Sequence, residues 1–289
     1  MIRSGSRERI LVTGAGGQLG KELVQLLKVK NIEVYGLARD QLDITDCDTV
    51  LKQVEQLSPT AIIHAAAYTQ VDRAEAEPEI AFRCNAIGTR NVAVAAAKVG
   101  AKLVYVSTDY VFDGSEGSSY NEWSKTSPIN VYGQSKLAGE QFVRHHHNRF
   151  FIVRTSWVYG AYGNNFVKTM LKLGAEHGAV RVVEDQVGSP TYTYDLAMTI
   201  IAMLQTEKYG LYHISNTGKC SWFEFAQEIF KQAKMEVQVT PISTSDMPRP
   251  AARPAYSVME PVMLRLNDFP LLPTWQQALH HYLQNNRTD

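Results

Sequence analysis

Tyrosine and lysine stand four positions apart in Tyr132-Gly133-Gln134-Ser135-Lys136, a spacing that suits acid–base chemistry. In a helix this spacing places both side chains on one face. Free tyrosine has a pKa of about 10, and a neighbouring ammonium favours the phenolate and lowers that pKa. The pair is therefore suited to protonating the oxyanion that is left when hydride reaches a carbonyl carbon. The same lysine can also hold the ribose of a nicotinamide cofactor.

A hydroxyl group to orient the carbonyl is offered by Ser107-Thr108-Asp109, which follows the apolar run ending at Val106. Residues just beyond the carboxyl ends of parallel strands line the ligand crevice of open α/β sheets. A tyrosine–lysine pair alone is common by chance. The combination is much more specific than the pair alone when a glycine turn, a strand-end hydroxyl and the tyrosine–lysine pair follow one another in that order along the chain.

The glycine turn runs from Gly14 to Gly20 and reads Gly-Ala-Gly-Gly-Gln-Leu-Gly. Its glycines follow the pattern GxxGxxG. Gly14 allows the tight turn, Gly17 lets the backbone approach a pyrophosphate, and Gly20 lets the helix pack closely on the strand. The following helix offers free N–H groups and partial positive charge to the phosphates. A turn without a ligand is the less favoured alternative, because strand, turn and helix come in the order of a dinucleotide-binding unit.

The residue that reads the adenosine ribose is expected about 20 residues beyond the turn, at the end of the second strand. Ala38-Arg39-Asp40 occupies that place. An acidic residue directly after the strand favours NAD, whereas Arg39 can pair with a 2′-phosphate, so the sequence favours NADPH. The alternative is that Arg39 is a solvated charge and NADH is used as well. Asp43 and Ile44 would flank the adenine ring.

Short apolar runs alternate with helical patterns through the first half of the chain. The predicted strands are 10–12, 34–37, 61–64, 103–106 and 151–153, and the predicted helices are 18–28, from about 46, 78–99 and 131–143. Such strands indicate a parallel sheet covered on both faces, a doubly wound, Rossmann-type α/β fold. Residues 1–155 are assigned mainly to this dinucleotide-binding domain. Residues 156–289 are assigned mainly to a smaller C-terminal substrate-binding cap, with segments that return to the sheet.

The composition excludes several classes of protein. Lysine plus arginine and aspartate plus glutamate number 29 each, so no net field attracts nucleic acid or an anionic membrane. The three cysteines (Cys47, Cys84 and Cys220) are scattered, which favours free thiols over disulfides or a zinc site. No stretch has the length of a membrane span and no signal-peptide pattern is present, so the sequence predicts a cytoplasmic protein.

The sequence resembles the extended short-chain dehydrogenase/reductase superfamily and, within it, the dTDP-4-dehydrorhamnose reductases. The resemblance covers essentially the whole chain. Besides the glycine turn and Tyr132 to Lys136, the segments that carry it are AAAYTQVD (65–72), STDYVF (107–112), RTSW (154–157), GNNF (163–166), DQVGSPT (185–191) and ARP (252–254).

The resemblance implies NADPH-dependent reduction of the C4 keto group of dTDP-4-dehydro-6-deoxy-L-mannose, giving dTDP-L-rhamnose for surface polysaccharide. It implies that Tyr132 donates the proton, with Lys136 as its partner and Thr108 as the hydroxyl that tunes it. Asp109 and Trp157 would contact the sugar. Further cofactor contacts would come from Gln18, Leu19, Ala65, Ala66, Ala67, Tyr68 and Thr69.

Two properties stay open at this point. Some members of the family carry glutamates that share a magnesium ion at a dimer contact. Glu22 stands at one such place, but Tyr194 stands where another is expected. A homodimer is therefore implied only by the resemblance, the need for magnesium is open, and no metal ligand is assigned.

Other interpretations depend on particular residues. A sugar-nucleotide epimerase or dehydratase can use the same scaffold, but Tyr110 follows Thr108-Asp109 where a dehydratase usually has an Asp-Glu pair. A non-catalytic regulatory subunit like that of methionine adenosyltransferase would bind dinucleotide and a partner enzyme. A complete set of Thr108, Tyr132 and Lys136 argues against that reading.

Four polar or aromatic features have a structural alternative. Asn85 is predicted to brace the site from the core, and His145-His146-His147 to end a helix rather than bind metal. Trp157, just past a strand end, favours sugar contact over a purely structural role. For Arg253, contact with the substrate diphosphate and a loop salt bridge are equally favoured.

Overall fold

The structure is a computed structural model and describes residues 8–286. Its strands are β1 (Arg9–Thr13), β2 (Glu33–Leu37), β3 (Ala61–His64), β4 (Lys102–Thr108), β5 (Phe150–Thr155), β6 (Val158–Tyr159), β7 (Ala179–Val183), β8 (Val187–Gly188), β9 (Thr191–Tyr192), β10 (Gly210–His213), β11 (Cys220–Ser221) and β12 (Gln238–Ile242).

The helices include two short 3₁₀ turns, η2 and η3, and one π-helical turn, η1. In chain order they are α1 (Gln18–Val29), α2 (Cys47–Leu57), α3 (Val71–Ala76), α4 (Pro78–Phe82), η1 (Arg83–Gly88), α5 (Thr89–Val99), η2 (Asp109–Val111), α6 (Val131–His146), α7 (Phe166–His177), α8 (Thr193–Leu204), α9 (Trp222–Ala233), η3 (Thr244–Asp246), α10 (Val262–Leu266) and α11 (Trp275–Asn285). Within residues 8–286, no helix has both the length and the apolar character to span a bilayer.

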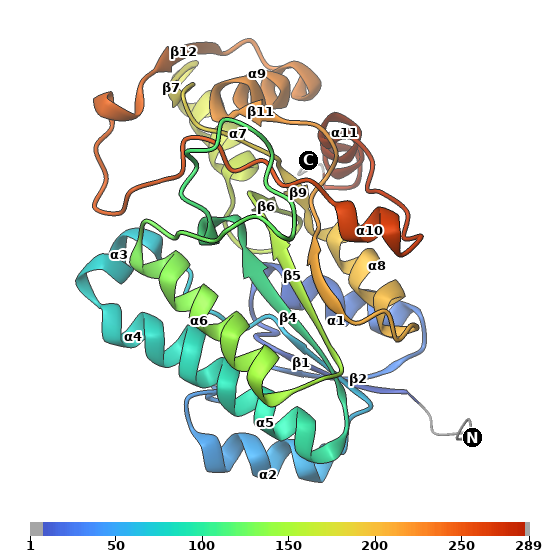
Figure 1. Cartoon of the computed structure of the whole chain (residues 1–289). Helices are drawn as coiled ribbons and strands as arrows, with labels where there is room; N and C mark the ends of the chain where they lie inside the picture. The colour runs from blue at the N-terminus through green and yellow to red at the C-terminus, as the bar shows by residue number, and fades with distance from the viewer. Residues whose placement is uncertain (1–7, 287–289) are drawn as a thin grey trace.

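A six-stranded sheet in the order β10-β5-β4-β3-β1-β2 forms the centre of the molecule. Every neighbouring pair in it is parallel. From β1 the chain moves out to β2 at one edge, returns to β3, and continues through β4 and β5 toward the other edge. This is the predicted doubly wound arrangement, with connecting helices on both faces of the sheet (Figure 1).

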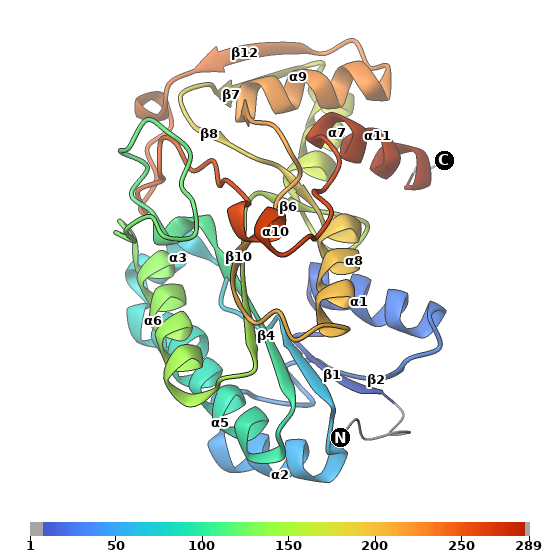
Figure 2. The ribbon, with the colours of Figure 1, turned by 45° about the vertical axis from the view of Figure 1, so that its right-hand side comes forward.

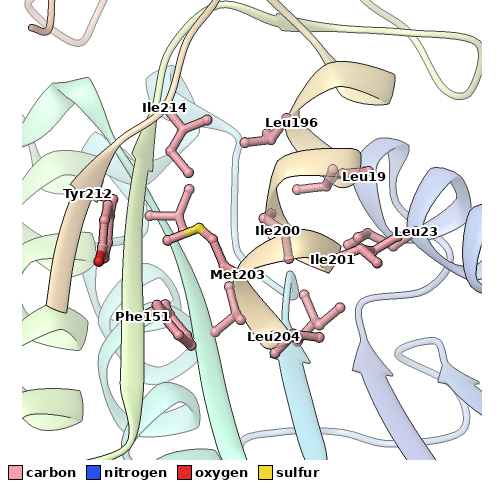
Figure 3. Packing of buried hydrophobic residues seen from close by; sticks show 14 of the residues in the cluster. Leu19, Leu23, Phe151, Leu196, Ile200, Ile201, Met203, Leu204, Tyr212 and Ile214 are labelled. Atoms are coloured by element: carbon pink, nitrogen blue, oxygen red, sulfur yellow. The ribbon is translucent and has the colours of Figure 1, made fainter. Parts of the chain in front are cut away.

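Both faces of the sheet are apolar because alternate residues of a strand point to opposite sides. In β1, Ile10 and Val12 pack into the layer that contains α1 and α8, whereas Leu11 packs into the layer that contains α2 and α5. Figure 3 shows side chains of α1 and α8 meeting those of β5 and β10 in the first of these layers. Burial on both faces fixes the sheet, and with it the strand ends that carry the site.

The later part of the chain builds a second body over the carboxyl ends of the sheet strands (Figures 1 and 2). There β7 and β12 pair in parallel, and α7, α9 and α11 surround an apolar core of their own. Phe225 and Phe230 of α9 are buried in that core. Two elements return to the sheet: β10 pairs with β5, and α8 packs against α1.

The alanine-rich stretch predicted as one helix over 78–99 is helical throughout, but it widens into a π-helical turn in the middle, which was not predicted. α4 runs into the π-helical turn η1 before α5 begins. The turn carries Asn85, which hydrogen-bonds to the backbone of Tyr68 and to the hydroxyl of Ser135. The wider turn thus serves contacts to two other segments, and π-turns inside helices are frequent at functional sites.

Candidate active site

The start of α6 positions Tyr132 and Lys136. Asn130 caps the helix by accepting a hydrogen bond at 2.7 Å from an N–H of the first turn, and the Glu75 carboxylate accepts one from the Val131 N–H at 2.8 Å. These acceptors satisfy amides that a helix start otherwise leaves free. The first turn of α6, and with it the phenol of Tyr132, is therefore held in place from two sides.

Lys136 lies enclosed between α6 and β4. Its side chain is 2% exposed, its Nζ donates to the Val106 carbonyl at 2.6 Å, and the same atom lies 4.2 Å from the centre of the Tyr105 ring. Burial lowers the pKa of Lys136 to about 8. The ammonium is thus still present at neutral pH, but it titrates far closer to neutrality than a surface lysine.

The expectation that Lys136 lowers the pKa of Tyr132 is wrong in this structure. Burial is the largest influence and raises the pKa of the Tyr132 phenol, a hydrogen bond with the Thr108 hydroxyl lowers it, and the nearby Asp109 and Tyr110 raise it further. The Lys136 ammonium instead donates a hydrogen bond to a backbone carbonyl. Tyr132 is therefore a neutral acid at physiological pH.

Thr108 and Asp109 form a buried pair at the end of β4. The Thr108 hydroxyl donates to Asp109 Oδ1 at 3.0 Å and accepts from the Tyr110 N–H at 3.2 Å. Asp109 Oδ2 accepts from the hydroxyl of Ser257 at 2.7 Å. Asp109 is 3% exposed, and burial raises its pKa to about 6. The carboxyl predicted to contact a sugar is thus held by two hydroxyl groups of the protein itself.

Ser107, the other hydroxyl at this strand end, faces a different group. It donates to Glu140 at 2.6 Å, and Glu140 forms a two-pronged ion pair with Arg154 at 2.9 and 2.7 Å. The side chains of this ion pair are almost completely buried. Of the two hydroxyls left open by the sequence, Thr108 is therefore the one beside Tyr132, and Ser107 belongs to a structural network.

The glycine turn has the shape that a dinucleotide phosphate requires. Gly14 has a φ of 71°, and a Cβ added there would lie 2.6 Å from the backbone of Ala66. A Cβ added at Gly20 would lie 2.2 Å from the Gly14 carbonyl oxygen. Gly17 is the N-cap of α1, and no side chain caps the amides of its first turn. Those N–H groups fit a pyrophosphate, so the turn supports the dinucleotide assignment.

Gln18 and Leu19 contribute backbone rather than side chains to this cradle. The Gln18 amide donates to the Val158 carbonyl at 3.2 Å and accepts from Asn165 at 3.0 Å, which links α1 to the later part of the chain. The Leu19 side chain is buried in the core beside the sheet (Figure 3).

Arg39 follows β2, and its side chain is exposed. Burial raises the pKa of the Cys84 thiol, and the charges of Lys136 and Arg39 oppose that effect. Asp43 is exposed and accepts from both the N–H and the hydroxyl of Thr45 at 2.9 Å. Ile44, in contrast, has its side chain in the core, so it can offer a cofactor only backbone atoms.

The segment after β3 lies beside the glycine turn, since the Ala65 N–H donates to the Thr13 carbonyl at 3.2 Å. Asn85 holds this segment by accepting from the Tyr68 N–H at 2.7 Å and donating to the Tyr68 carbonyl at 3.0 Å, and it also donates to the Ser135 hydroxyl at 2.9 Å. Asn85 is fully buried, which confirms its predicted bracing role. Ala65, Ala66, Ala67 and Tyr68 are half-buried and Thr69 is exposed.

Trp157 has a φ of 48°, which is rare for a bulky residue. Its ring stacks on Trp222 with centres 3.6 Å apart and planes 7° apart, and the absence of a side chain at Gly188 makes room for it. Strained backbone of this kind concentrates at functional sites, which supports the predicted sugar contact. The stacked partner shows that the ring also has a structural role.

Arg253 lies in a strap, residues 251–259, that crosses toward the sheet strand ends. Its guanidinium forms a two-pronged ion pair with Asp72 at 2.5 and 2.9 Å and donates to the Ala251 carbonyl at 2.6 Å. Of the two roles favoured equally by the sequence, the loop salt bridge is present in the structure. A diphosphate would have to use the remaining N–H groups of Arg253.

Glu22 is buried in α1 and accepts from the Thr193 hydroxyl at 3.1 Å, and burial raises its pKa. Tyr194 stacks on Tyr192 and packs against His281. Across residues 8–286, three or more His, Cys, Asp or Glu side chains nowhere gather in a way that could hold a metal ion. Glu22 therefore lacks carboxylate partners within the described part of one chain.

Three supporting residues were not predicted from the sequence. Ser257 holds Asp109, and Glu75 holds the start of α6. Each of the two comes from a segment that is distant in sequence from the group it holds. His64 lies buried between the hydroxyls of Thr13 and Thr89, at 2.7 and 3.1 Å, where burial and then the charge of Lys136 lower its pKa to about 3. Only His64 carried a signal, as a polar residue ending an apolar strand.

The sequence matches the family described as RmlD substrate binding domain over residues 8–288. It is 41% identical to the spore coat polysaccharide biosynthesis protein SpsK of Bacillus subtilis (strain 168), over 96% of this chain and 97% of that protein. It is 42% identical to a dTDP-4-dehydrorhamnose reductase of Aggregatibacter actinomycetemcomitans, over 94% and 97%. The crystal structure of dTDP-4-dehydrorhamnose reductase from Bacillus anthracis str. Ames in complex with NADP shares 52% identity and a TM-score of 0.95, over 97% of this chain and 100% of that one.

Proposed function

This chain belongs to the RmlD substrate binding domain family, and from that premise we propose that it is an NADPH-dependent reductase of dTDP-4-dehydro-6-deoxy-L-mannose. The reaction turns the C4 keto group into a hydroxyl and yields dTDP-L-rhamnose. Relatives about 40% identical over nearly the whole chain carry this activity in their names. The observation in the chain itself that carries the proposal is Tyr132 at the capped start of α6, whose phenol is kept neutral because burial raises its pKa.

The chain's own residues supply the proton and the geometry. Tyr132 gives its proton to the C4 oxygen as that oxygen gains negative charge, and Thr108 orients the phenol. Lys136 supplies a positive charge beside the same strand end. Trp157 would bound the sugar. Asp109 would contact the sugar as well, and it also orients the Thr108 hydroxyl, which donates to it.

NADPH, when bound, supplies the hydride. Gly14, Gly17 and the first amides of α1 would hold its pyrophosphate, and Arg39 would pair with the 2′-phosphate. The segment 65–69, clamped by Asn85, would lie along the cofactor. An exposed Arg39 without an acidic residue directly after β2 supports a preference for NADPH, with NADH as a weaker donor.

The proposal also includes the cellular location, the roles of the two parts of the chain and the oligomeric state. We place the chain in the cytoplasm, because Cys47, Cys84 and Cys220 are free thiols and the reaction uses a nucleotide cofactor. We assign residues 1–155 mainly to cofactor binding and residues 156–289 mainly to the substrate. Two copies would form a homodimer, with no nucleic acid or membrane as partner.

The deciding experiment follows NADPH and NADH oxidation with dTDP-4-dehydro-L-rhamnose, generated in place by upstream enzymes. Substrate-dependent oxidation with an equal amount of dTDP-rhamnose formed is the expected result, with the higher rate for NADPH. Tight dinucleotide binding without oxidation would overturn the proposal. It would favour another keto sugar or a binding role like that of a regulatory subunit.

A further inference from the structure

The inner face of α6 carries two opposite charges one helical turn apart. Lys136 and Glu140 are four residues apart, so their side chains lie on the same face of the helix, and both are buried. They meet successive residues of β4. Lys136 Nζ donates to the Val106 carbonyl at 2.6 Å, and Glu140 accepts from the Ser107 hydroxyl at 2.6 Å. The helix that carries Tyr132 is thus bonded to β4 at two adjacent positions.

Arg154 of β5 holds the Glu140 carboxylate from the other side. Its Nε and one terminal nitrogen donate to the two Glu140 oxygens at 2.9 and 2.7 Å. Its other terminal nitrogen lies 3.4 Å from His213 Nε2, and its guanidinium carbon lies 5.1 Å from the centre of the Phe112 ring. Because the guanidinium is enclosed by these three groups, the carboxylate that it grips is fixed in position beneath the site.

The Lys136 ammonium, in contrast, donates to a neutral backbone carbonyl rather than to a carboxylate. Burial lowers its pKa to about 8, and negative charge at Cys84 and at Glu140 acts in the opposite direction. Burial also raises the pKa of the Cys84 thiol above its ordinary value, so this thiol is uncharged at neutral pH. Glu140 is therefore the lasting negative charge that favours the charged form of Lys136.

We propose that Glu140 and Arg154 are positioning residues for Lys136. Glu140 provides a negative charge one helical turn from the buried ammonium, which helps Lys136 to keep its proton, and Arg154 locks the carboxylate in that orientation. The inference rests on the proposed function, in which the Lys136 ammonium lies beside the strand end that receives the substrate. An ion pair that only supported the fold would have no effect on the charge of Lys136.

The other titratable groups that face Lys136 do not change charge in the same range of pH. The Tyr105 ring of β4 lies 4.2 Å from Lys136 Nζ, and burial raises the pKa of this phenol well above its ordinary value. Burial lowers the pKa of His64 in β3 to about 3. Asp109, at the neighbouring strand end, has a pKa of about 6 and titrates on the acid side. A loss of activity on the alkaline side of neutrality therefore reports on Lys136.

Glu140→Gln tests the proposal, because it removes the negative charge and keeps the size of the side chain. In the wild type, we expect the rate of NADPH oxidation with the keto sugar to fall as the pH rises through about 8. In the variant, this fall should move to lower pH by about one unit or more, since an opposite charge nearby has been lost. A rate that is lower by the same factor at every pH would overturn the proposal.

Two further variants separate charge from packing. Glu140→Gln combined with Arg154→Met removes both buried charges, so no unpaired guanidinium repels Lys136, and the fall should lie between those of the wild type and Glu140→Gln. A fall at the wild-type pH in this double variant contradicts the proposal even if Glu140→Gln fails to fold. Ser107→Ala removes a hydrogen bond to Glu140 without a change of charge, and its fall should stay at the wild-type pH. An equal shift in Ser107→Ala and Glu140→Gln would also overturn the proposal.

Unfolding of the cofactor-free chain gives a readout that needs no turnover. The folded pKa of Lys136, about 8, lies below its unfolded value of about 10.4, so stability should rise with pH between these values. Comparison with Lys136→Met isolates this rise, and in Glu140→Gln it should begin at lower pH. A wild type that oxidises no NADPH, with the rise displaced in Glu140→Gln, removes the proposed function alone. A wild type that turns over, with neither profile displaced, removes the role of the ion pair alone.

Discussion

Burial sets the protonation state of the groups around Tyr132. The pKa of Tyr132 and that of Asp109 are raised, and those of Lys136 and His64 are lowered, in each case with burial as the largest cause. All four shifts favour the uncharged form, because a poorly solvated site disfavours charge. At neutral pH, Tyr132 and His64 are therefore uncharged, whereas Lys136 keeps its positive charge.

Replacement of Tyr132 by phenylalanine removes the proton donor and little else. We expect turnover to fall by about 100-fold or more, since general acid catalysis typically contributes that much. NADPH binding should be nearly unchanged, because the phosphate cradle lies in the glycine turn. Steady-state kinetics and a fluorescence titration with NADPH measure the two effects. Turnover near the wild-type level in this variant would contradict the assignment of Tyr132.

Asp109→Asn should also change how stability depends on pH. The folded pKa of about 6 lies above the unfolded value of about 3.9. Protonated Asp109 therefore contributes stability that is complete below about pH 4 and is lost as the pH rises through about 6, roughly 3 kcal/mol in all. Asparagine cannot ionise and has no such loss.

The measurement is denaturant unfolding of both proteins at pH 4 and pH 7. The difference in unfolding free energy should move in favour of the variant by about 2 kcal/mol between these values. Parallel pH profiles would mean that Asp109 ionises in the folded chain as readily as in water.

At the scale of elements, one glycine sets how closely α6 approaches the sheet. A Cβ added at Gly139 would lie 2.4 Å from the Tyr105 hydroxyl and 2.5 Å from the Asn85 carbonyl oxygen. Both neighbours are buried. The helix that carries Tyr132 and Lys136 therefore rests directly on β4 and η1 at this point.

Gly139→Ala should push α6 outward and disturb the site at its other end. Overpacking of this kind costs about 1–3 kcal/mol of stability, and turnover should fall more than NADPH binding. Gln141→Ala, an exposed substitution two residues along the same helix, should stay within about 0.5 kcal/mol of wild type. Thermal unfolding and kinetics of the pair provide the test. Equal effects in both variants would mean that the helix start, not its packing, positions Tyr132.

The strands, the glycine turn and the start of α6 could be predicted because their signals are local. An apolar run that ends at a glycine turn marks β1, and the helix predicted from about residue 46 is α2, which Asp46 caps by accepting from the Thr49 N–H. The π-turn η1 could not be predicted, since an alanine-rich segment has no distinct apolar face that would show a change of period. Its cause lies in contacts to Tyr68 and Ser135.

Some features of the site could likewise be predicted from the sequence, and others could not. Tyr132, Lys136 and Thr108 follow from motifs, but the direction of the Tyr132 pKa shift depends on burial, which spacing does not show. Ser257 reaches Asp109 across 148 residues of sequence. No local pattern marks such a residue.

At the scale of the whole molecule, the strap joins the later part of the chain to the catalytic residues. Asn130 donates to the Ala252 carbonyl at 2.8 Å, Arg253 pairs with Asp72, and Ser257 donates to Asp109. The helix cap of α6 and the Thr108–Asp109 pair at the end of β4 are thus both bonded to one segment. Movement of the strap would reach both at once.

The ion pair of Asp72 and Arg253 should behave as a coupled unit. In a double-mutant cycle with Asp72→Asn and Arg253→Met, we expect a coupling of about 1 kcal/mol or more in unfolding free energy. The matched pair Arg73 and Glu77 is more exposed and should give less, within about 0.2–1 kcal/mol. Denaturant unfolding of the variants supplies the numbers. No coupling, with a raised KM in Arg253→Met alone, would instead assign Arg253 to the substrate.

Because β10 lies late in the sequence, its pairing with β5 is delayed while the protein is being synthesised. β5 has β4 on one side as soon as it emerges, but its other edge stays unpaired until β10 has been synthesised. Roughly 50 residues separate the two strands, which takes about 3–10 s at ordinary translation rates. During that interval the nascent chain exposes an apolar strand edge, the kind of surface to which chaperones and other unfinished chains bind.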